Sequence, residues 1–398
     1  MRIGFCARCA VYCLLPLLAA QVASAGALDR PAAVGTRDIS LGCDPDDPLL
    51  PGNLASSIQL KDPLAVVGAE LMVPRFTYTS PLGGRIHSNN LAHALPYLTY
   101  ARPLGDWMAF KVNVSTPFGL GSSFEKNPQQ LGYDTSTLIS LTTLVPSLSF
   151  RLTDTLALGV GVSIGWGQFK YKAPFDVERV PLPLGTSSKA MGFGIGGGAG
   201  LLFHLDDRFA VGVNYMSPTY VPLIGRTHIA IGPWEIRDHF ESSITFPDKL
   251  DVGIAWKPTV SERWLLCADY NWYGYSKTPN DMTLTFRDLP LKKSNNLSWK
   301  DNFSAHFGTS YKVTKSLTVR GGFGYLSQSI PEKTLSTLTL DVPGWDVALG
   351  CTYRIGDRVA LDASLTRGWG KSRVDGGIMQ GRYSADIYTF ALVGNTLF

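Results

Sequence analysis

Histidine, serine and acidic side chains supply most enzymatic nucleophiles and general bases, so their spacing is the first test for a catalytic site. The six histidines are scattered along the chain: His87, His93, His204, His228, His239 and His306. No Ser/His/Asp cluster accompanies them in the sequence. We therefore predict that the protein is not an enzyme and that it uses no cofactor.

The cysteines do not predict a metal site either. Three of the six fall in the apolar N-terminal stretch, and the remaining three, Cys43, Cys267 and Cys351, lack the short spacing of metal-binding motifs. Because cysteine packs readily as a small hydrophobic residue, we interpret these three as structural thiols. No bound metal is expected.

The first 25 residues read as a secretory signal peptide. Arg2 and Arg8 form a basic start, residues 10–20 are apolar, and Ala23-Ser24-Ala25 fits a small-x-small cleavage site, so cleavage is expected after Ala25. No 18-residue apolar run follows, and therefore no transmembrane helix is predicted. The net charge is +4 without any Lys/Arg-rich run, which argues against nucleic acid as a partner.

One short segment could open a path through a sheet. Ser115-Thr116-Pro117-Phe118-Gly119-Leu120 interrupts a regular alternation of apolar residues that runs through residues 107–114. Proline removes a donor from the strand ladder, and glycine favours a bulge or bend. In a membrane barrel such an interruption would leave a gap in the wall. The other reading is that the strand simply ends here before a loop.

Fourteen segments must position these residues, and many of them alternate with the period of two that is typical of a β-strand with one apolar face. In one of them Trp345, Val347 and Leu349 share a face, opposite Asp346 and Ala348. The predicted strands are 66–79, 91–102, 107–118, 137–152, 155–172, 190–205, 208–219, 243–258, 263–276, 300–313, 316–328, 344–355, 358–371 and 384–398. The last one has an apolar stripe and needs a partner on both edges.

The connections between these segments alternate in length. Six are short: 103–106, 153–154, 206–207, 259–262, 314–315 and 356–357. Seven are long: 80–90, 119–136, 173–189, 220–242, 277–299, 329–343 and 372–383. Outer-membrane barrels have short periplasmic turns and long external loops, whereas a soluble β-sandwich has no reason for this pattern. We predict an all-β fold, a 14-stranded antiparallel transmembrane β-barrel over residues 66–398, in the outer membrane of a Gram-negative bacterium.

Residues 26–65 differ from the strands. They contain Pro31, Pro45, Pro48, Pro51 and Pro63 and show no alternation. One reading is a flexible N-terminal tail. The other is a compact plug, because fourteen strands enclose a lumen that must be filled or will leak. We predict that residues 26–65 form an N-terminal hatch in the lumen.

Several short motifs follow one another along the chain: Leu104-Gly105-Asp106-Trp107 leading to 114–120, 146–152 with 156–161, 192–203 followed by 211–217, Phe246-Pro247-Asp248-Lys249-Leu250, Trp299-Lys300-Asp301 and Val319-Arg320-Gly321-Gly322. In this order and spacing they resemble the FadL/TodX family of outer-membrane transporters for long-chain fatty acids and aromatic hydrocarbons. The resemblance covers nearly all of the chain after the signal peptide.

The resemblance implies a monomeric barrel with a hatch that takes up hydrophobic compounds. A long-chain fatty acid or an aromatic hydrocarbon would bind in the lumen and leave sideways into the outer-membrane lipid at a kinked third strand. The implied hatch motif is Asn53, Leu54 and Ala55, and the implied lateral gate is Ser115, Pro117, Gly119 and Leu120. The ligand-binding candidates are Thr116, Phe118, Lys170, Lys172, Lys292 and Lys293.

Two positions depart from the family pattern. The family hatch carries Asn-Pro-Ala, whereas this chain has Asn53-Leu54-Ala55, and where the family often has acidic residues this chain has Leu326-Ser327-Gln328. Both departures bear on how the hatch would open. The alternative function is a general porin or a structural surface protein, which predicts an open lumen with salt-dependent conductance.

Overall fold

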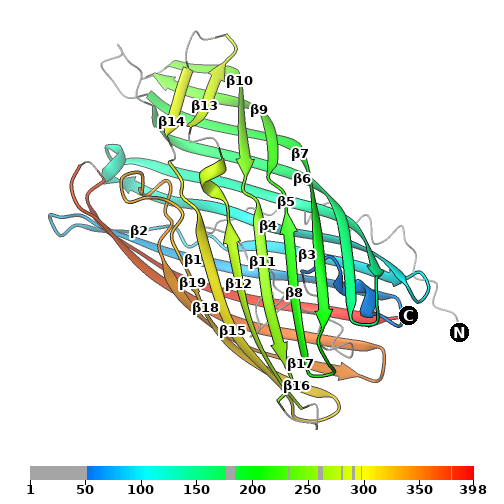
Figure 1. The fold of residues 1–398 in the computed structure, drawn as a ribbon. Coiled ribbons are helices and arrows are strands. Elements are labelled where there is room, and N and C mark those ends of the chain that lie inside the picture. The colour runs from blue at the N-terminus through cyan, green and yellow to red at the C-terminus, as the bar shows by residue number, and fades with distance from the viewer. Residues whose placement is uncertain are drawn as a thin grey trace, which may run out of the picture.

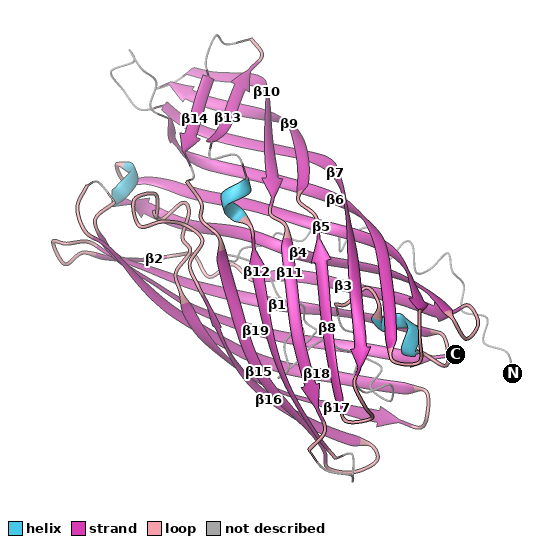
Figure 2. Cartoon of the chain, in the orientation of Figure 1, coloured by secondary structure: helices cyan, strands magenta, loops and turns pink. Residues whose placement is uncertain are grey.

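The computed structural model describes residues 52–175, 184–231, 234–258, 263–278, 281–288, 292–296, 298–377 and 379–398. The predicted signal peptide, its cleavage site and most of the predicted hatch lie outside these ranges. Strands dominate the described part, as Figure 2 shows. Its helices are short 3-10 turns: η2 Ser56–Gln59, η3 Pro128–Gln130 and η4 Tyr275–Lys277. None of the described helices has the length and apolar character to span a membrane.

The strands form one closed antiparallel sheet (Figure 1). The last strand pairs with the first, from Leu64↔Leu397 to Thr79↔Arg382, and the first also pairs with β3, so the barrel is closed. The strands are β1 Leu64–Thr79, β2 Arg85–His87, β3 His93–Pro103, β4 Met108–Asn127, β5 Tyr133–Arg151, β6 Leu156–Phe175, β7 Leu184–His204, β8 Phe209–Met216, β9 Thr219–Ile231, β10 Trp234–Phe246, β11 Lys249–Trp256, β12 Trp264–Tyr273, β13 Asp281–Phe286, β14 Lys292–Asn296, β15 Asn302–Lys312, β16 Leu317–Leu326, β17 Gly344–Ile355, β18 Val359–Val374 and β19 Gly381–Leu397.

These segments build fourteen wall strands, as predicted. Strand β2 continues the line of β3, and four further wall strands are each divided into two segments: β8 with β9, β10 with β11, β12 with β13, and β14 with β15. The predicted alternation is also confirmed. In β17 the side chains of Val347 and Leu349 are exposed on the outer face, whereas Ala348 between them is buried.

Strand residues extend into several of the predicted long loops. The segment 220–242 forms parts of β9 and β10, and 277–299 contains β13 and β14. Segment 119–136 is largely taken up by the ends of β4 and β5. The physical reason is visible in β9, where Ile229 is buried between the exposed residues His228 and Ala230. The strands are therefore longer than predicted at the ends that carry the long loops.

The lumen has two chemically different halves. We call the end with the tight turns the short-turn end and the opposite end the long-loop end. Towards the short-turn end and the middle, buried inward side chains are polar: Lys111, Asn214, Asp251, Asp269, Ser304, His306, Arg320, Asp362 and Asn395. Towards the long-loop end they are apolar: Phe76, Phe118, Phe169, Leu223, Phe240, Leu284 and Ile330 belong to one packed cluster.

Candidate functional site

The described part of the predicted hatch is held by directional hydrogen bonds. Asn53, Leu54 and Ala55 are buried against the inner wall. The Nδ2 atom of Asn53 donates to the carbonyl oxygen of Leu201 at 2.8 Å, and its Oδ1 accepts from the backbone N–H of Ala55 at 2.8 Å. The N–H of Leu54 donates to Asn214 Oδ1 at 3.1 Å. The Asn-Leu-Ala motif therefore makes a local turn and fixes it to β7 and β8.

Glycines in the wall make room for this turn. A Cβ atom at Gly159 of β6 would overlap the backbone of Leu54, and one at Gly200 of β7 would overlap the side chain of Asn53. Real Cβ atoms do not approach backbone atoms so closely, so only glycine allows the hatch to lie directly on these strands. The glycine-rich character of β6 and β7 thus has a structural cause at this contact.

A lysine completes the hatch contacts. Lys111 of β4 is buried, and its Nζ donates to the carbonyl oxygen of Asn53 at 2.8 Å and to Ser56 Oγ at 3.3 Å. On β5, Ser149 Oγ lies 2.7 Å from Ser57 Oγ. Lys111 therefore has a specific partner in the hatch. Buried charges require such partners.

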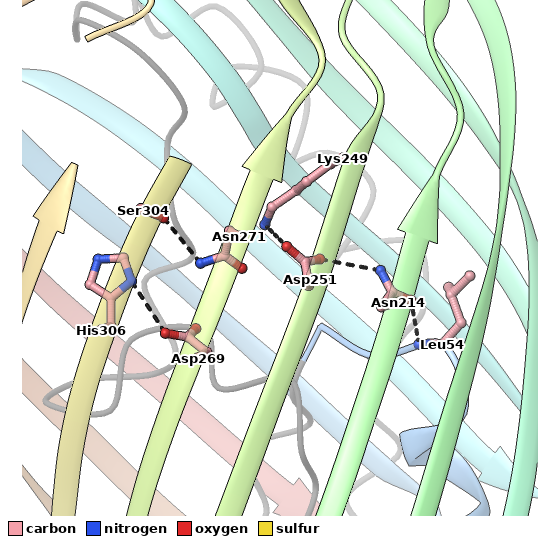
Figure 3. Close-up of polar contacts among 8 residues, drawn as sticks. All are labelled: Leu54, Asn214, Lys249, Asp251, Asp269, Asn271, Ser304 and His306. Carbon is pink, nitrogen blue, oxygen red and sulfur yellow. Dashed lines mark hydrogen bonds and ion pairs between the residues drawn. The ribbon is translucent and has the colours of Figure 1, made fainter. Parts of the chain in front are cut away.

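A polar network continues from the hatch around the inner wall (Figure 3). Asn214, which binds Leu54, also lies 3.4 Å from Asp251 Oδ2, and Asp251 Oδ1 lies 2.9 Å from Lys249 Nζ. Figure 3 shows these side chains projecting to the same side of the sheet. The hatch is therefore connected through hydrogen bonds and an ion pair to β8 and β11.

The same wall carries a histidine between two carboxylates. His306 Nδ1 lies 3.3 Å from Asp269 Oδ1, and its Nε2 lies 3.6 Å from Asp346 Oδ2. Beside them Asn271 donates to Ser304 Oγ at 3.1 Å (Figure 3). Within the described ranges no cluster of His, Cys, Asp or Glu has the grouping that could hold a metal ion. The arrangement serves to satisfy buried polar groups in the wall.

The third wall strand, β4, carries the irregularity that the sequence predicted. Its register against β5 shifts between Ser115 and Phe118, which is a β-bulge. The strand continues to Asn127, so the reading of this segment as a simple strand end is wrong. On its other side, the ladder with β3 ends at the pair Leu98↔Val114. The next backbone contact is from the N–H of Asn89 to the carbonyl oxygen of Ser123, at 2.8 Å.

Beyond the bulge, β4 and β5 turn towards the lumen. Leu138 lies on the β5 stripe that otherwise faces outwards, yet it is buried against Met72 and Leu95, which point inwards from β1 and β3. The wall therefore overlaps itself at this point. The unpaired stretch of β4 forms an interruption between β3 and β4, at the residues where the gap was expected.

A cavity links the hatch to this interruption. It contains about 830 Å³ of free space, part of it open to solvent. Leu54 of the hatch, Ser115, Pro117 and Phe118 of the bulge, and Tyr97 of β3 all line it. Two lysines, Lys111 and Lys249, also line its wall. The cavity thus combines apolar side chains with two buried cationic groups.

The other gate candidates lie close by. Gly119 and Leu120 line a second, smaller cavity of about 340 Å³, which Phe118 and Ile330 share. Thr116, a ligand-binding candidate, lies in the bulge with its Oγ1 3.0 Å from Thr142 Oγ1. Of the candidates for ligand contact, Phe118 lines both cavities.

The four candidate lysines are not brought to these cavities. Lys170 and Lys172 lie on the stripe of β6 that carries the exposed residues Val162 and Ile164, so they face away from the lumen, and Lys172 is 3.8 Å from Asp134. The side chains of Lys292 and Lys293 lie outside the described part of the structure. The cavity instead uses Lys249, whose motif Pro247-Asp248-Lys249-Leu250 was already visible in the sequence.

The sequence did not predict that the loop between β16 and β17 folds into the barrel. Ile330 and Leu335 of this loop are buried in the apolar cluster. Asn127 Nδ2 donates to Thr337 Oγ1 at 2.6 Å, and Gln129 Oε1 accepts from the N–H of Thr337 at 3.0 Å. A signal was present, because Leu338, Leu340 and Val342 alternate with polar residues in a segment read as a loop.

An aspartate anchors the base of this loop. Asp341 Oδ2 accepts from the N–H and the Oγ of Ser329, at 2.7 and 2.6 Å, and from the N–H of Ile330 at 3.2 Å. Burial raises the pKa of Asp341 above the usual carboxyl range, although these hydrogen bonds act in the opposite direction. Docking of the loop is therefore tied to the protonation of one carboxyl group.

Comparisons with known proteins identify relatives of this barrel. A family model described as outer membrane protein transport protein (OMPP1/FadL/TodX) matches residues 56–396. A FadL homologue from Pseudomonas aeruginosa has 18% identity and a TM-score of 0.80, with 94% of this chain and 100% of that chain covered. The toluene transporter TbuX from Ralstonia pickettii has 18% identity and a TM-score of 0.74, with 92% and 98% covered. The toluene transporter TodX from Pseudomonas putida has 17% identity and a TM-score of 0.73, with 95% and 100% covered.

The comparison with curated protein sequences gives no match. At these identities the solved structures show a shared fold, whereas the family model covers most of the chain. The relatives are transport proteins and channels, in agreement with the prediction that the protein is not an enzyme. The match over residues 56–396, together with the closed barrel, shows that the chain belongs to the OMPP1/FadL/TodX family of outer membrane transport proteins.

Proposed function

We propose that this protein takes up apolar molecules by binding them in the lumen beside the hatch and releasing them sideways between β3 and β4 into the outer leaflet. The observation that carries the proposal is that one cavity is lined by both Leu54 of the hatch and Pro117 and Phe118 of the bulge. A ligand in this cavity would lie directly behind the interruption in the wall.

The lateral route is also the energetically favourable one. An apolar chain gains about 0.8 kcal/mol for each CH₂ group removed from water. Passage through the short-turn end would take the ligand past Lys111, Asp251 and the other buried polar groups and then into water. A sideways exit at Phe118 keeps the ligand among apolar groups until it reaches lipid.

We further propose that the preferred ligand carries an anionic head, as a long-chain fatty acid does. Lys111 and Lys249 both line the cavity, so two cationic side chains lie at the wall that an anionic head would contact. An aromatic hydrocarbon would use the apolar lining but not the lysines. The solved relatives include toluene transporters as well as a FadL homologue, so both ligand classes are tested below.

We propose that the hatch comprises residues 26–65, of which residues 52–65 are described. We also propose that the barrel acts as a monomer, since β1 and β19 pair with each other and leave no free sheet edge. The protein would then act as a multi-pass barrel in the outer membrane, reached after removal of the signal peptide.

The direct test compares uptake of labelled oleate by cells lacking their own transporter. Gly119→Arg places a long charged side chain in the smaller cavity beside the gate, and uptake should be lost. Gly185→Arg is the matched control, because a Cβ there meets its nearest neighbour only at 3.8 Å, on a strand away from the gate. Equal uptake by both variants at equal surface level would reject the lateral route.

The ligand class is tested with Lys249→Met. We expect oleate uptake to fall and labelled toluene uptake to stay unchanged, because only oleate has a carboxylate for the lysine. If Lys249→Met changes the uptake of neither compound, or lowers the uptake of both, the proposal of an anionic head is rejected. Large salt-dependent conductance of the wild-type barrel would favour the general porin instead.

A further inference from the structure

Basic residues are aligned across five neighbouring wall strands near the long-loop end. Strand register places them directly opposite one another: Lys170 of β6, Lys189 of β7, Arg226 of β9, His239 of β10 and Arg287 beyond β13. The N–H of Arg287 donates to the carbonyl oxygen of His239 at 2.9 Å, which fixes the last step. We call this set the first basic row.

A second row lies two residues further along the strands. It consists of Lys172 of β6, His228 of β9 and Arg237 of β10, with Ser187 of β7 between the first two. Directly opposite residues in an antiparallel pair have Cβ atoms about 5 Å apart, and two residues along a strand span about 7 Å. Five strands at about 4.8 Å spacing make the first row about 19 Å wide.

Both rows face the outside of the barrel. On β7 the residues that share the stripe of Lys189 are exposed, including Met191 at 58%, Phe193 at 67% and Ile195 at 75%. On β9, Ile224 shares the stripe of Arg226 and is 68% exposed, whereas Leu223 is buried in the lumen. On β6, β7 and β9 the basic rows therefore lie immediately beyond a broad apolar surface.

The rows themselves contain no carboxylate among the described residues. Glu241 lies two residues below the first row on β10, opposite Ile224, and Glu235 lies two residues beyond the second row, opposite Ala230. The ion pair found in this region, within the described ranges, joins Lys172 to Asp134 at 3.8 Å. Like charges directly opposite one another in a sheet are destabilising. Three such cations in a line, Lys170, Lys189 and Arg226, repel one another, and an anion bound across them would offset this repulsion.

The opposite side of the barrel shows that this arrangement is not general. There, Arg367 of β18 binds Asp386 of β19 at 3.0 Å, and Arg75 of β1 lies opposite the same Asp386. Both guanidinium groups also lie over the ring of Tyr388, at 5.5 and 5.3 Å. On that side a carboxylate and an aromatic ring of the protein lie against the two outward arginines, whereas the basic rows contain no carboxylate among the described residues.

We infer that the basic rows, with the apolar surface beneath them, form a binding site for a phosphorylated lipid of the outer leaflet. Lysine and arginine bind phosphate oxygens, and arginine can do so in a bidentate manner. The phosphate groups would lie on Lys189, Arg226 and their neighbours, while the acyl chains run over Met191, Phe193 and Ile224. The site is distinct from the transport cavity, which lies on the inner face of the wall.

Titration of the purified barrel in neutral detergent micelles tests this site. The probe is diphosphoryl lipid A, compared with the same lipid after removal of its phosphates. The combined change Lys189→Gln and Arg226→Gln should weaken binding of the diphosphoryl lipid about 30-fold, since each cation near an anionic lipid surface contributes roughly one factor of five. The matched control, Arg75→Gln with Arg367→Gln, removes the same amount of positive charge. It should change binding about twofold at most, because those two arginines already lie against Asp386 and Tyr388 of the protein.

Each outcome of the titration supports or overturns the proposed lipid site. An equal loss in both double variants would show attraction by net charge alone and overturn the site, as would equal binding of the dephosphorylated lipid. Inorganic pyrophosphate that displaces the lipid at similar concentration would assign the rows to free phosphate rather than lipid. If the combined variant fails to fold, the single changes Lys189→Gln and Arg226→Gln provide the test, since each should weaken binding about fivefold.

Discussion

The described segments that fold into the two halves of the lumen are held there by different contacts. At the short-turn end, the hatch is held by hydrogen bonds in fixed directions, with Asn53 bound to β7 and Lys111 bound to the hatch carbonyl. At the long-loop end, burial of side chains such as Ile330 and Leu335 in the apolar cluster adds to the hydrogen bonds that hold the loop between β16 and β17 at Thr337 and Asp341. A polar contact can be exchanged for water or for another polar partner, whereas an apolar contact can be replaced by an apolar ligand.

This difference indicates how each closure could respond to a ligand. Phe118 stands at the boundary, since it lines the large cavity beside the hatch and the small cavity beside Ile330. An apolar molecule entering from outside competes first with loop side chains that resemble it chemically. The polar contacts of the hatch do not resemble such a ligand, so the hatch should remain closed while the ligand passes to the side.

The largest effect is expected from removing the polar closure. Deleting residues 26–60, with the signal peptide retained, should convert a closed barrel into one with a large continuous conductance in planar bilayers. Leu335→Asp, which loosens only the apolar closure, should leave the barrel closed to ions because the hatch remains. An unchanged conductance after the deletion would reject the hatch as the plug of this barrel.

A single substitution at Gly159 should produce part of the conductance that is expected from the deletion. Gly159→Leu places atoms where the Leu54 backbone lies, and overpacking of this kind costs roughly 1–3 kcal/mol or more. We expect transient openings in single-channel recordings and increased protease sensitivity near the hatch. The control is Gly321→Leu, where the nearest atom to an added Cβ is a side-chain atom of Leu349 at 3.7 Å. Identical recordings from both variants would contradict the close contact.

The sequence predicted the wall well because the wall obeys a local rule. Alternation with period two fixes which residues of β17 face lipid, and the pattern of tight turns fixes the strand count. The bulge at Ser115–Phe118 was also predictable, because proline and glycine act on their own strand. Asn53, Leu54 and Ala55 could be located only by their resemblance to a family motif.

Contacts between distant segments could not be predicted in the same way. The loop between β16 and β17 was expected outside the barrel, since its alternating leucines do not reveal which cavity they fill. Lys170 and Lys172 were expected near the ligand from the family resemblance alone, although the alternation of the predicted strand 155–172 places them on the same outward stripe as Val162 and Ile164. The partner of Lys111 lies 58 residues away, and no local pattern specifies it.

A smaller effect should follow from removing one hatch contact. Lys111→Met keeps the length of the side chain but leaves the Asn53 carbonyl and Ser56 Oγ without this donor, at a cost of roughly 1–3 kcal/mol. Hydrogen exchange should become faster at the Leu54 and Ala55 amides. Lys257→Met is the control, on a half-exposed lysine at the end of β11. Protection that stays unchanged in Lys111→Met would place the stability of the hatch in its glycine contacts instead.

The smallest effect concerns the outer closure and its single buried carboxyl group. Burial raises the pKa of Asp341, so the docked loop binds a proton more readily than the released loop. Docking is therefore strongest below the ordinary carboxyl pKa of about 3.9 and weakens as the pH rises through the raised value. Hydrogen exchange at Ile330, corrected for its intrinsic pH dependence, should show this loss of protection. Asp341→Asn should remove the pH dependence, because the amide does not titrate, while the hatch amides respond to pH equally in both proteins. A pH dependence that persists in Asp341→Asn would assign the titration to another group and leave the outer closure governed by apolar burial alone.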